Sequence, residues 1–291
     1  MSDALTLDVK DLRLSFRNWM GTSQVLHGID LTIAKGERVA LVGESGSGKS
    51  VTSRIVLGTM QDVRNARVSG QVAFEGRDLA SMTAAARRDL RGRDMSMIFQ
   101  DPTTALNPVF RIEALFHAVQ KRRDPTLSLA QARINAAQIL RDVSIDDTER
   151  VLDSYSFQLS GGMNQRVMIA MALINKPRLL LADEPGTALD VTVQAQTLHL
   201  MRDLVEQRGT SLLYTSQNLG VVREFADRIY VIYQGNIVET GPTATLFDNP
   251  QHPYTRALLA AIPRLTGGGV PEIEVRSPAF NDPMISHGET G

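Results

Sequence analysis

Apolar and polar positions alternate along much of the first 40 residues, and this pattern predicts β-strands. Leu5, Leu7 and Val9 alternate with polar residues, and Leu31 and Ile33 do so again before Gly36. The run RVALVG at 38–43 is apolar until it ends at glycine, as is typical of a parallel strand buried on both faces. The stretch SGQVAFEGRDL predicts another strand pair.

The pattern changes to helical spacing between about residues 83 and 176. Segments such as TAAARRDLRG and LAQARINAAQILRDV carry this spacing, and only MSMIFQD at 95–101 interrupts it. Strand-like runs return in LLLADE and SLLYTS, and RIYVIYQGNIVETG predicts a hairpin. We therefore expect a parallel sheet interrupted by a helical insertion over roughly residues 101–165. The Gly- and Pro-rich residues after about 262 predict a loosely ordered tail.

The motif GESGSGKS at 43–50 fits the pattern G-x-x-x-x-G-K-[ST] and lies between a predicted strand and a predicted helix. Its glycines let backbone N–H groups turn inward around phosphate oxygens. Lys49 supplies a charge for the β- and γ-phosphates, and Ser50 offers a hydroxyl to Mg²⁺. A Gly/Ser-rich turn without a ligand would share the pattern, but the flanking strand and helix favour a nucleoside triphosphate site.

A second motif, LLLADEP, places two acids at the end of a predicted buried strand. Asp183 would lie beside the metal ion, and Glu184 could orient or deprotonate an attacking water. The alternative is a strand that ends in two solvated acids, which the phosphate loop about 130 residues earlier disfavours. For Gln100, at the end of MSMIFQ, a solvated strand-end glutamine is as good an interpretation as a functional one.

The segment LSGGMNQR at 159–166 provides a second anion-binding device, because two glycines before a helix expose N–H groups at its positive end. One nucleotide needs only one phosphate loop, so two devices on one chain suggest that two chains share each nucleotide. With these residues, the sequence resembles the ATP-binding subunit of ABC transporters. The resemblance covers about residues 5–262 and includes an "ALD" loop at 188–190.

This resemblance implies an α/β fold: a P-loop NTPase, ABC-type ATPase core with a mixed or parallel sheet flanked by helices and with antiparallel N-terminal strands. It also implies an inserted helical subdomain that carries the signature LSGGM. The expected divisions are the core at 1–100 and 166–248, the helical signature subdomain at 101–165, and a C-terminal helix with the tail at 249–291.

The resemblance also implies ATP and Mg²⁺ as cofactors and a role for each site residue. The expected catalytic residues are Glu184, Gln217 and Gln100, and the expected metal ligands are Ser50, Gln100 and Asp183. The expected nucleotide-binding residues are Phe16, Gly43, Ser45, Gly46, Gly48, Lys49, Ser50, Ser160, Gly161 and Gly162. Either Phe16 or Trp19 would stack on adenine, and plain packing is an alternative for both.

The stretches QDPTTALNPVF and NPQHPYTRALLAAIP resemble the peptide and nickel importer branch, which also serves opines and some sugar conjugates. This branch implies a second, different ATPase subunit, two permeases, an extracytoplasmic binding protein and a peripheral place on the cytoplasmic face of the membrane. The transported substrate stays open. HPYT itself predicts a short amphipathic helix entered through proline and serves here as a family marker.

Three positions depart from the family pattern. In the family, the strand after the two acids ends in Ser or Thr, then His, then usually Asp, whereas this chain has Gln217 and Asn218 at the last two positions. Gly186 stands where threonine is usual. Glutamine can still donate a hydrogen bond to phosphate but cannot become cationic. We therefore expect this chain's own site to bind ATP and to hydrolyse it slowly, with near-normal catalysis as the alternative.

Composition narrows the range of functions further. The net charge of −1 gives no basic field for nucleic acid, and the absence of cysteine excludes disulfides and a cysteine-ligated iron–sulfur cluster. MSDALTLDVK does not fit a secretory signal, and VMIAMALI is far shorter than the ~20 residues of a membrane span. We expect a soluble intracellular protein. A non-transport ABC ATPase and a regulatory clamp that binds ATP with little hydrolysis remain as alternatives.

Overall fold

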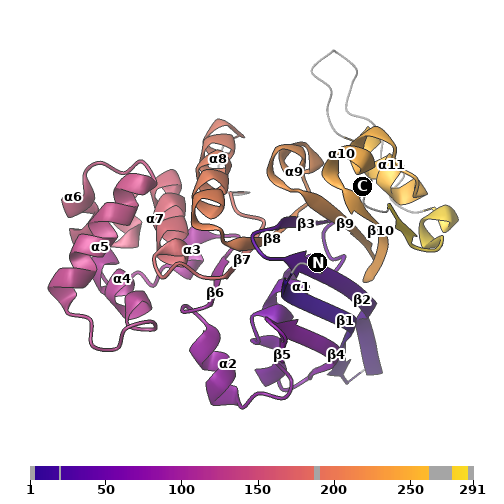
Figure 1. Cartoon of the computed structure of the whole chain (residues 1–291), viewed down its shortest axis with the longest axis horizontal. Coiled ribbons are helices and arrows are strands. Elements are labelled where there is room, and N and C mark those ends of the chain that lie inside the picture. The colour runs from indigo at the N-terminus through magenta and orange to yellow at the C-terminus, as the bar shows by residue number, and fades with distance from the viewer. Residues whose placement is uncertain (1–3, 20, 187–190, 262–276, 288–291) are drawn as a thin grey trace. The chain divides into compact units, whose positions relative to one another are not determined.

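The computed structural model describes residues 4–19, 21–186, 191–261 and 277–287, which form two compact units (Figure 1). One unit comprises Met1–Ser81 with Leu213–Gly291, and the other comprises Met82–Leu212. The boundary runs through strand β8 (Ser211–Ser216). These units are defined by contacts between backbone segments. The divisions expected from the family pattern are a different description of the chain and stay a prediction: the core at 1–100 and 166–248, the helical subdomain at 101–165 and the C-terminal part at 249–291.

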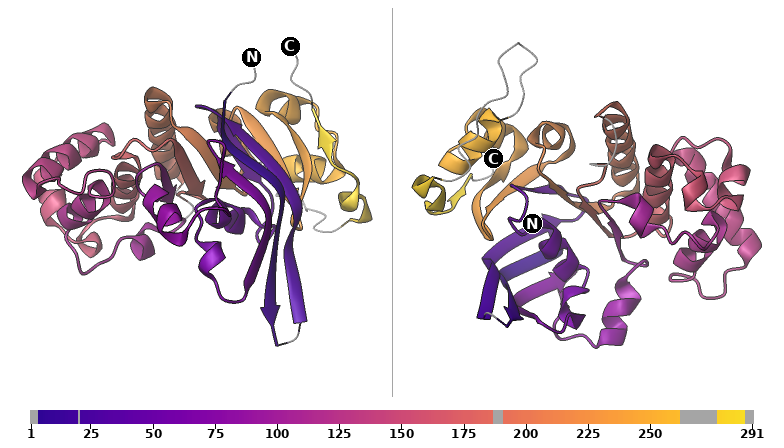
Figure 2. Two further views of the ribbon diagram at one scale, coloured as in Figure 1. Left: turned by 60° about the horizontal axis from the view of Figure 1, so that its bottom comes forward. Right: turned by 180° about the vertical axis from the view of Figure 1, so that it is seen from behind.

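An antiparallel sheet forms the N-terminal part of the first unit. Alternation buries Leu7 and Val9, and after a register shift between Val9 and Leu12 it buries Leu14; all three are at most 1% exposed. Leu14 pairs with Leu26 on the neighbouring strand, and Figure 2 shows these two strands as long paired arrows. The strand order is β2-β1-β4-β5, with β1 (Leu5–Asn18), β2 (Gly21–Ala34), β4 (Ala66–Phe74) and β5 (Arg77–Asp78).

A second sheet in this unit contains the continuously apolar strand that the sequence predicts. Within this unit its strands follow the order β11-β10-β9-β3-β8; β3 pairs with β9 in parallel, and β9 and β10 form the predicted hairpin. Its other strands are β3 (Arg38–Val42), β9 (Arg228–Tyr233), β10 (Asn236–Pro242) and β11 (Ile285–Ser286). The helical segments of the unit are α1 (Lys49–Val56), η1 (Met60–Asp62), α9 (Leu219–Phe225), α10 (Thr243–Asp248), α11 (Pro253–Ala260) and η3 (Pro278–Asn281).

A half-buried arginine joins the two sheets of the first unit. Arg228 on β9 donates to Glu37 Oε1 at 2.7 Å and to the carbonyl of Thr32, on β2, at 2.9 Å. Burial alone would lower the pKa of Arg228, but Glu37 and the hydroxyl group of Tyr230 outweigh it and raise the pKa above its usual value. The guanidinium therefore stays charged and fixes the edge of β2 to β9.

The second unit contains a pair of parallel strands and a group of helices that includes the predicted insertion. The strands β6 (Met95–Ile98) and β7 (Leu179–Asp183) pair in register from Met95 opposite Leu179 to Ile98 opposite Ala182. The helical segments are α2 (Ala84–Leu90), α3 (Pro102–Ala105), α4 (Ile112–Gln120), α5 (Leu129–Asp142), α6 (Thr148–Asp153), η2 (Ser156–Gln158), α7 (Gly161–Leu173) and α8 (Val191–Arg208).

Helices α4, α5 and α6 pack around an apolar centre and share one arginine. Phe116 and Leu140 are fully buried between them. Arg133 on α5 forms ion pairs with Glu113 on α4 and with Glu149 and Asp153 at the two ends of α6. These hydrogen bonds raise the pKa of Arg133 above its ordinary value, so its charge joins the three helices at any physiological pH.

Within the described residues, no helix is both long and apolar enough to span a bilayer.

Part of the expected C-terminal tail has defined structure. Residues 277–287 contain η3 and β11, and β11 pairs in parallel with β10 through Glu239 opposite Ile285. Phe280 within η3 is 3% exposed. The rest of the tail lies outside the described residues.

Candidate nucleotide-binding site

The phosphate loop follows β3 and leads into α1, and two glycines permit its path. A Cβ on Gly43 would lie 2.1 Å from the carbonyl oxygen of Ile232 on β9. Gly48 has φ +114°, and a Cβ there would lie 2.6 Å from the side chain of Leu26. Larger residues are therefore excluded at both positions, because the backbone of the loop packs directly against two sheets.

Lys49 lies on the inner side of the loop. It is 3% exposed, and its Nζ donates to the carbonyl oxygens of Gly43 at 2.9 Å and of Glu44 at 2.8 Å. A cationic group held by two carbonyls within its own loop has little freedom to move away. The arrangement preorganises a positive charge at the mouth of the loop, as binding of a phosphate requires.

Several polar groups of the loop make no hydrogen bond within the part of the chain that the structure describes. They are the Oγ of Ser47, which is 2% exposed, and the backbone N–H groups of Ser45, Gly46 and Gly48. Ser47 and Gly48 are buried, whereas Ser45 and Gly46 are exposed, and buried polar groups without a hydrogen bond are rare in a folded protein. Together with the lysine, this ring of donors fits a phosphate chain. Ser50, the expected Mg²⁺ ligand, is half-buried at the second position of α1.

The outer side of the loop is held by two contacts from distant parts of the chain. Gly235 N, in the β9–β10 turn, donates to the carbonyl of Ser47 at 3.0 Å. The N–H of Glu44 donates to the hydroxyl of Tyr254 at 3.0 Å. In the sequence, the HPYT segment indicates the family and a short helix, and it predicts no role for Tyr254 at the site. No local signal could have identified this contact, because 210 residues separate the two partners.

The two adenine candidates differ in burial. Phe16 is half-buried near the end of β1, opposite Ser23 on β2 and Ala66 on β4. Trp19 directly follows the strand and is 93% exposed. Both side chains present aromatic surface, as stacking on adenine requires.

Gln217 lies directly after β8, between two residues that form a tight turn. Asn218 N donates to the hydroxyl of Ser216 at 2.9 Å, and the side chain of Asn218 accepts from Gly220 N at 3.0 Å, which caps α9. The side chains of Gln217 and Asn218 are exposed. The end of β8 and the Asn218 cap of α9 therefore fix the backbone at Gln217, and its side chain lies at the surface.

The acidic motif lies in the second unit, at the end of β7. Asp183 is the last residue of the strand and is 4% exposed, and Glu184 is 7% exposed. Glu184 has φ +45°, a left-handed conformation that is uncommon for a residue with a side chain and that occurs frequently at functional sites. Gln100, also in this unit, is exposed two residues after the end of β6.

Gly186, two residues beyond Glu184, has φ +91°, and a Cβ there would lie 3.0 Å from the Cγ of Gln194. The threonine that is usual in the family would be strained in this conformation. Glycine at this departure from the family pattern therefore matches the backbone of this chain. The predicted loop at 188–190 lies outside the described residues.

The signature forms the start of α7, also in the second unit. Ser160 is its N-cap, and its hydroxyl accepts from Met163 N at 3.2 Å. Ser160 and Gly161 are exposed, and Gly162 is half-buried. The first turn therefore presents small residues and helix-end N–H groups at the surface, as an anion-binding helix start requires.

Comparisons with known proteins agree with this arrangement of motifs. Residues 26–187 match the family model described as "ABC transporter", which covers the phosphate loop, the signature and both acids. Residues 238–283 match "Oligopeptide/dipeptide transporter, C-terminal region", which includes the HPYT segment and most of the described part of the tail.

Two curated relatives are similar over most of the chain. The peptidoglycan transport ATP-binding protein YejF of Agrobacterium fabrum is 46% identical over 89% of this chain and 47% of its own, so the chain spans about half of that relative. The oligopeptide transport ATP-binding protein OppD of Bacillus subtilis is 43% identical over 92% of this chain and 74% of its own.

A solved structure has the same fold. The ATP-binding cassette MJ0796, in a dimeric post-hydrolysis state bound to ADP and Pi, superposes with a TM-score of 0.72 at 25% identity over 81% of this chain and 98% of its own. The expected fold class, an ABC-type ATPase core with an inserted helical part, is thus confirmed. The chain belongs to the ABC transporter family, as an ATP-binding subunit of its oligopeptide/dipeptide branch.

Proposed function

We propose that this chain powers an ABC importer for oligopeptides, dipeptides or a similar small solute. The observation that carries the proposal is the phosphate loop, where Lys49 is held by two loop carbonyls beside a ring of backbone donors. The C-terminal match at residues 238–283 and the oligopeptide transport name of the Bacillus relative support a peptide substrate.

Each site residue has a proposed role at the nucleotide that follows from the chemistry of its side chain or backbone. Bound Mg·ATP would supply the phosphoanhydride bond whose hydrolysis releases free energy. Lys49 and the loop N–H groups hold and neutralise the phosphates. Ser50, Asp183 and Gln100 would supply oxygen ligands for Mg²⁺, which prefers such donors. Glu184 orients or deprotonates the attacking water, and the amide of Gln217 donates a hydrogen bond toward the phosphate.

The assembly that this function needs contains several other chains. We infer a second, different ATPase subunit, two permeases and an extracytoplasmic binding protein, with this chain at the cytoplasmic face of the membrane. In a head-to-tail pair, the phosphate loop and acids of one chain face the signature of the other. The exposed start of α7, with Ser160 as its cap, supports this role because it presents N–H groups outward.

Within this assembly, the chain's own site would be the slower one. A charge-assisted hydrogen bond is about twice as strong as a neutral one, so Gln217 contributes less to catalysis than a histidine that can become cationic. ATP binding depends mainly on the phosphate loop and persists. The partner's site, completed by this chain's signature, then carries most of the hydrolysis.

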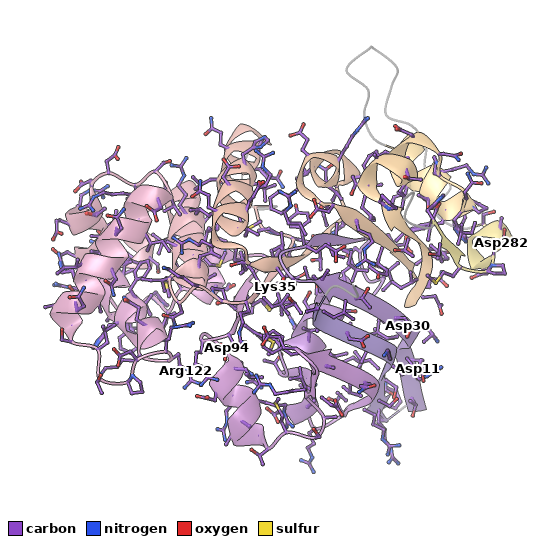
Figure 3. All side chains as sticks on the ribbon, viewed as in Figure 1. Asp11, Asp30, Lys35, Asp94, Arg122 and Asp282 are labelled. Atoms are coloured by element: carbon purple, nitrogen blue, oxygen red, sulfur yellow. The ribbon has the colours of Figure 1, made fainter. Side chains whose placement is uncertain are left out.

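Replacing the loop lysine tests whether the chain binds ATP. Lys49→Ala should weaken Mg·ATP binding about ten- to hundredfold, since a charge-assisted contact contributes about 1.5–3 kcal/mol. Lys35→Ala is the control, because Lys35 is an exposed lysine in the turn before β3 (Figure 3). Fluorescence titration with a labelled ATP analogue measures both, and unchanged affinity in Lys49→Ala would refute the proposal.

Copurification tests the transport role. We expect the chain to be recovered with two membrane permeases when expressed with its neighbouring genes. Recovery without any permease, together with rapid ATP hydrolysis by the isolated chain, would instead indicate a non-transport ABC ATPase.

A further inference from the structure

The start of helix α11 is tied to the second sheet of the first unit by a buried carboxylate. Glu239 on β10 is fully buried and accepts hydrogen bonds from Gln251 N at 2.8 Å and His252 N at 3.1 Å. Its Oε1 also lies 2.6 Å from Nε2 of His287 in the C-terminal segment. Burial alone would raise the pKa of Glu239, but the interaction with the side chain of Thr255, together with these hydrogen bonds, outweighs it and lowers the pKa, so the carboxylate stays charged.

His252 continues this connection to the C-terminal segment. It is fully buried, and its Nδ1 accepts from Tyr254 N at 3.2 Å, which caps the helix. Its Nε2 is then the protonated nitrogen and lies 3.3 Å from the carbonyl oxygen of Asp282, which lies near the C-terminal end of this unit (Figure 3). The backbone at Tyr254 is therefore fixed from both sides.

The ring of Tyr254 is fixed as well. Its centroid is 4.5 Å from that of Tyr233 on β9 and 5.3 Å from that of Phe280 on η3. Tyr254 is 5% exposed, and this burial raises the pKa of its hydroxyl to about 12. The hydroxyl is therefore neutral at physiological pH and is held in one place by packing on two sides.

This hydroxyl contacts the residue that positions the loop lysine. It accepts from Glu44 N at 3.0 Å, and the carbonyl of Glu44 accepts from Lys49 Nζ at 2.8 Å. The same carbonyl accepts from Ser47 N at 3.3 Å. Glu44 thus connects the two contacts, because its N–H binds the tyrosine hydroxyl and its carbonyl binds the loop lysine.

We propose that Tyr254 is a positioning residue of the nucleotide site, through which the C-terminal region holds the phosphate loop in its binding conformation. This inference rests on the proposed ATP binding. It also assigns a physical role to the HPYT segment: His252 caps the helix, Pro253 begins it, and Tyr254 reaches the loop. Loss of the hydroxyl leaves Glu44 N without this acceptor, so the loop can leave the binding conformation.

A matched pair of tyrosines tests the role of the hydroxyl. Tyr254→Phe keeps the ring and removes the acceptor, and it should weaken Mg·ATP binding about two- to tenfold, as loss of one neutral hydrogen bond implies. Tyr233→Phe is the control, because that hydroxyl lies in the same aromatic cluster but accepts from Gln234 Nε2 at 3.0 Å. Titration of the full chain at a temperature well below unfolding should show a change only in Tyr254→Phe.

Hydrogen exchange at the Glu44 amide provides a second readout. Exchange should be faster in Tyr254→Phe than in the wild type and unchanged in Tyr233→Phe. Phe280→Ala keeps the hydroxyl but loosens the ring, so it should give intermediate exchange and an intermediate affinity. This variant decides the question if Tyr254→Phe fails to fold.

The possible outcomes separate this inference from the proposed function. Equal Mg·ATP affinities for Tyr254→Phe and the wild type overturn the inference. An equal loss of affinity in Tyr254→Phe and Tyr233→Phe also overturns it, because packing alone would then explain the effect. If Tyr254→Phe fails to fold, Phe280→Ala is the deciding variant. An Mg·ATP affinity and a Glu44 amide exchange rate equal to those of the wild type in Phe280→Ala would then overturn the inference. A wild-type chain that does not bind ATP, or a Lys49→Ala variant that binds normally, would instead refute the proposed function.

Discussion

At the scale of single residues, Asn218 shows how a departure from the family pattern can keep one role and lose another. The family usually has aspartate at this position, and asparagine removes its charge. The side chain of Asn218 nevertheless accepts from Gly220 N and caps α9. Asparagine and aspartate are equally good N-caps because both present an oxygen to the free N–H groups. The change therefore affects the electrostatics near Gln217 and leaves the local fold intact.

Two substitutions at this cap give a direct comparison. Asn218→Ala should lower the free energy of unfolding by about 0.5–2 kcal/mol, because the N–H of Gly220 loses its acceptor. Asn218→Asp should leave that free energy nearly unchanged at neutral pH. Urea unfolding followed by circular dichroism measures both variants. A loss in the aspartate variant as large as that in the alanine variant would contradict the capping role.

At the scale of elements, one buried carboxylate joins the starts of the two parallel strands of the second unit. Asp94 precedes β6, is 5% exposed, and binds Arg93 at 2.8 Å and Arg178, before β7, at 3.0 Å (Figure 3). Its carbonyl also accepts from Arg178 N at 2.8 Å. Asp183 ends β7, so this junction helps to determine where the acidic motif lies.

Asp94→Asn should lower the free energy of unfolding by about 1–3 kcal/mol, because two arginines lose their buried counter-charge. Asp89→Asn is the control, since Asp89 pairs with the same Arg93 but is 54% exposed, and it should cost less than about 0.5 kcal/mol. Chemical unfolding of both variants at neutral pH measures the difference. Equal effects would show that Asp94 acts only as a surface charge.

The same junction predicts a pH dependence. Burial alone would raise the pKa of Asp94, but the hydrogen bonds from Arg93 and Arg178 outweigh it and hold the pKa below its usual value of 3.8. A lowered folded-state pKa contributes stability above the unfolded value, and that stability is lost as pH falls through the folded value. The advantage of the wild type over Asp94→Asn should therefore be constant above about pH 5 and shrink below pH 4.

At the scale of the whole molecule, the site residues are distributed over two units. The phosphate loop and Gln217 belong to the first, and Gln100, the signature and the acids belong to the second. In the proposed assembly, the signature of this chain serves the nucleotide of its partner. A substitution in this chain can therefore affect either site, depending on which motif it changes.

Because Gln217 stands where the family has histidine, the proposed assembly should be asymmetric in its ATPase activity. Glu184→Gln in this chain should reduce ATPase activity by less than about twofold, and the equivalent change in the partner should abolish it. Ser160→Arg should also be severe, because in the proposed assembly this residue would face the partner's nucleotide. ATPase assays on the purified complex measure all three. If Glu184→Gln stops the complex completely, Gln217 supports normal hydrolysis and the proposal of a slow site is wrong.

The sequence by itself determined the fold class, the family and the motifs, because each depends on short-range patterns. The phosphate loop needs glycines at fixed positions between a strand and a helix, and the apolar runs around it predict both elements. Only the tertiary structure decided what holds the loop in place. The partners of the Tyr254–Glu44 contact are 210 residues apart. Similarly, Asp94 joins strands whose pairing partners are 84 residues apart, as with Met95 opposite Leu179. Such contacts depend on how the sheets bring distant segments together, and neither periodicity nor a local motif encodes them.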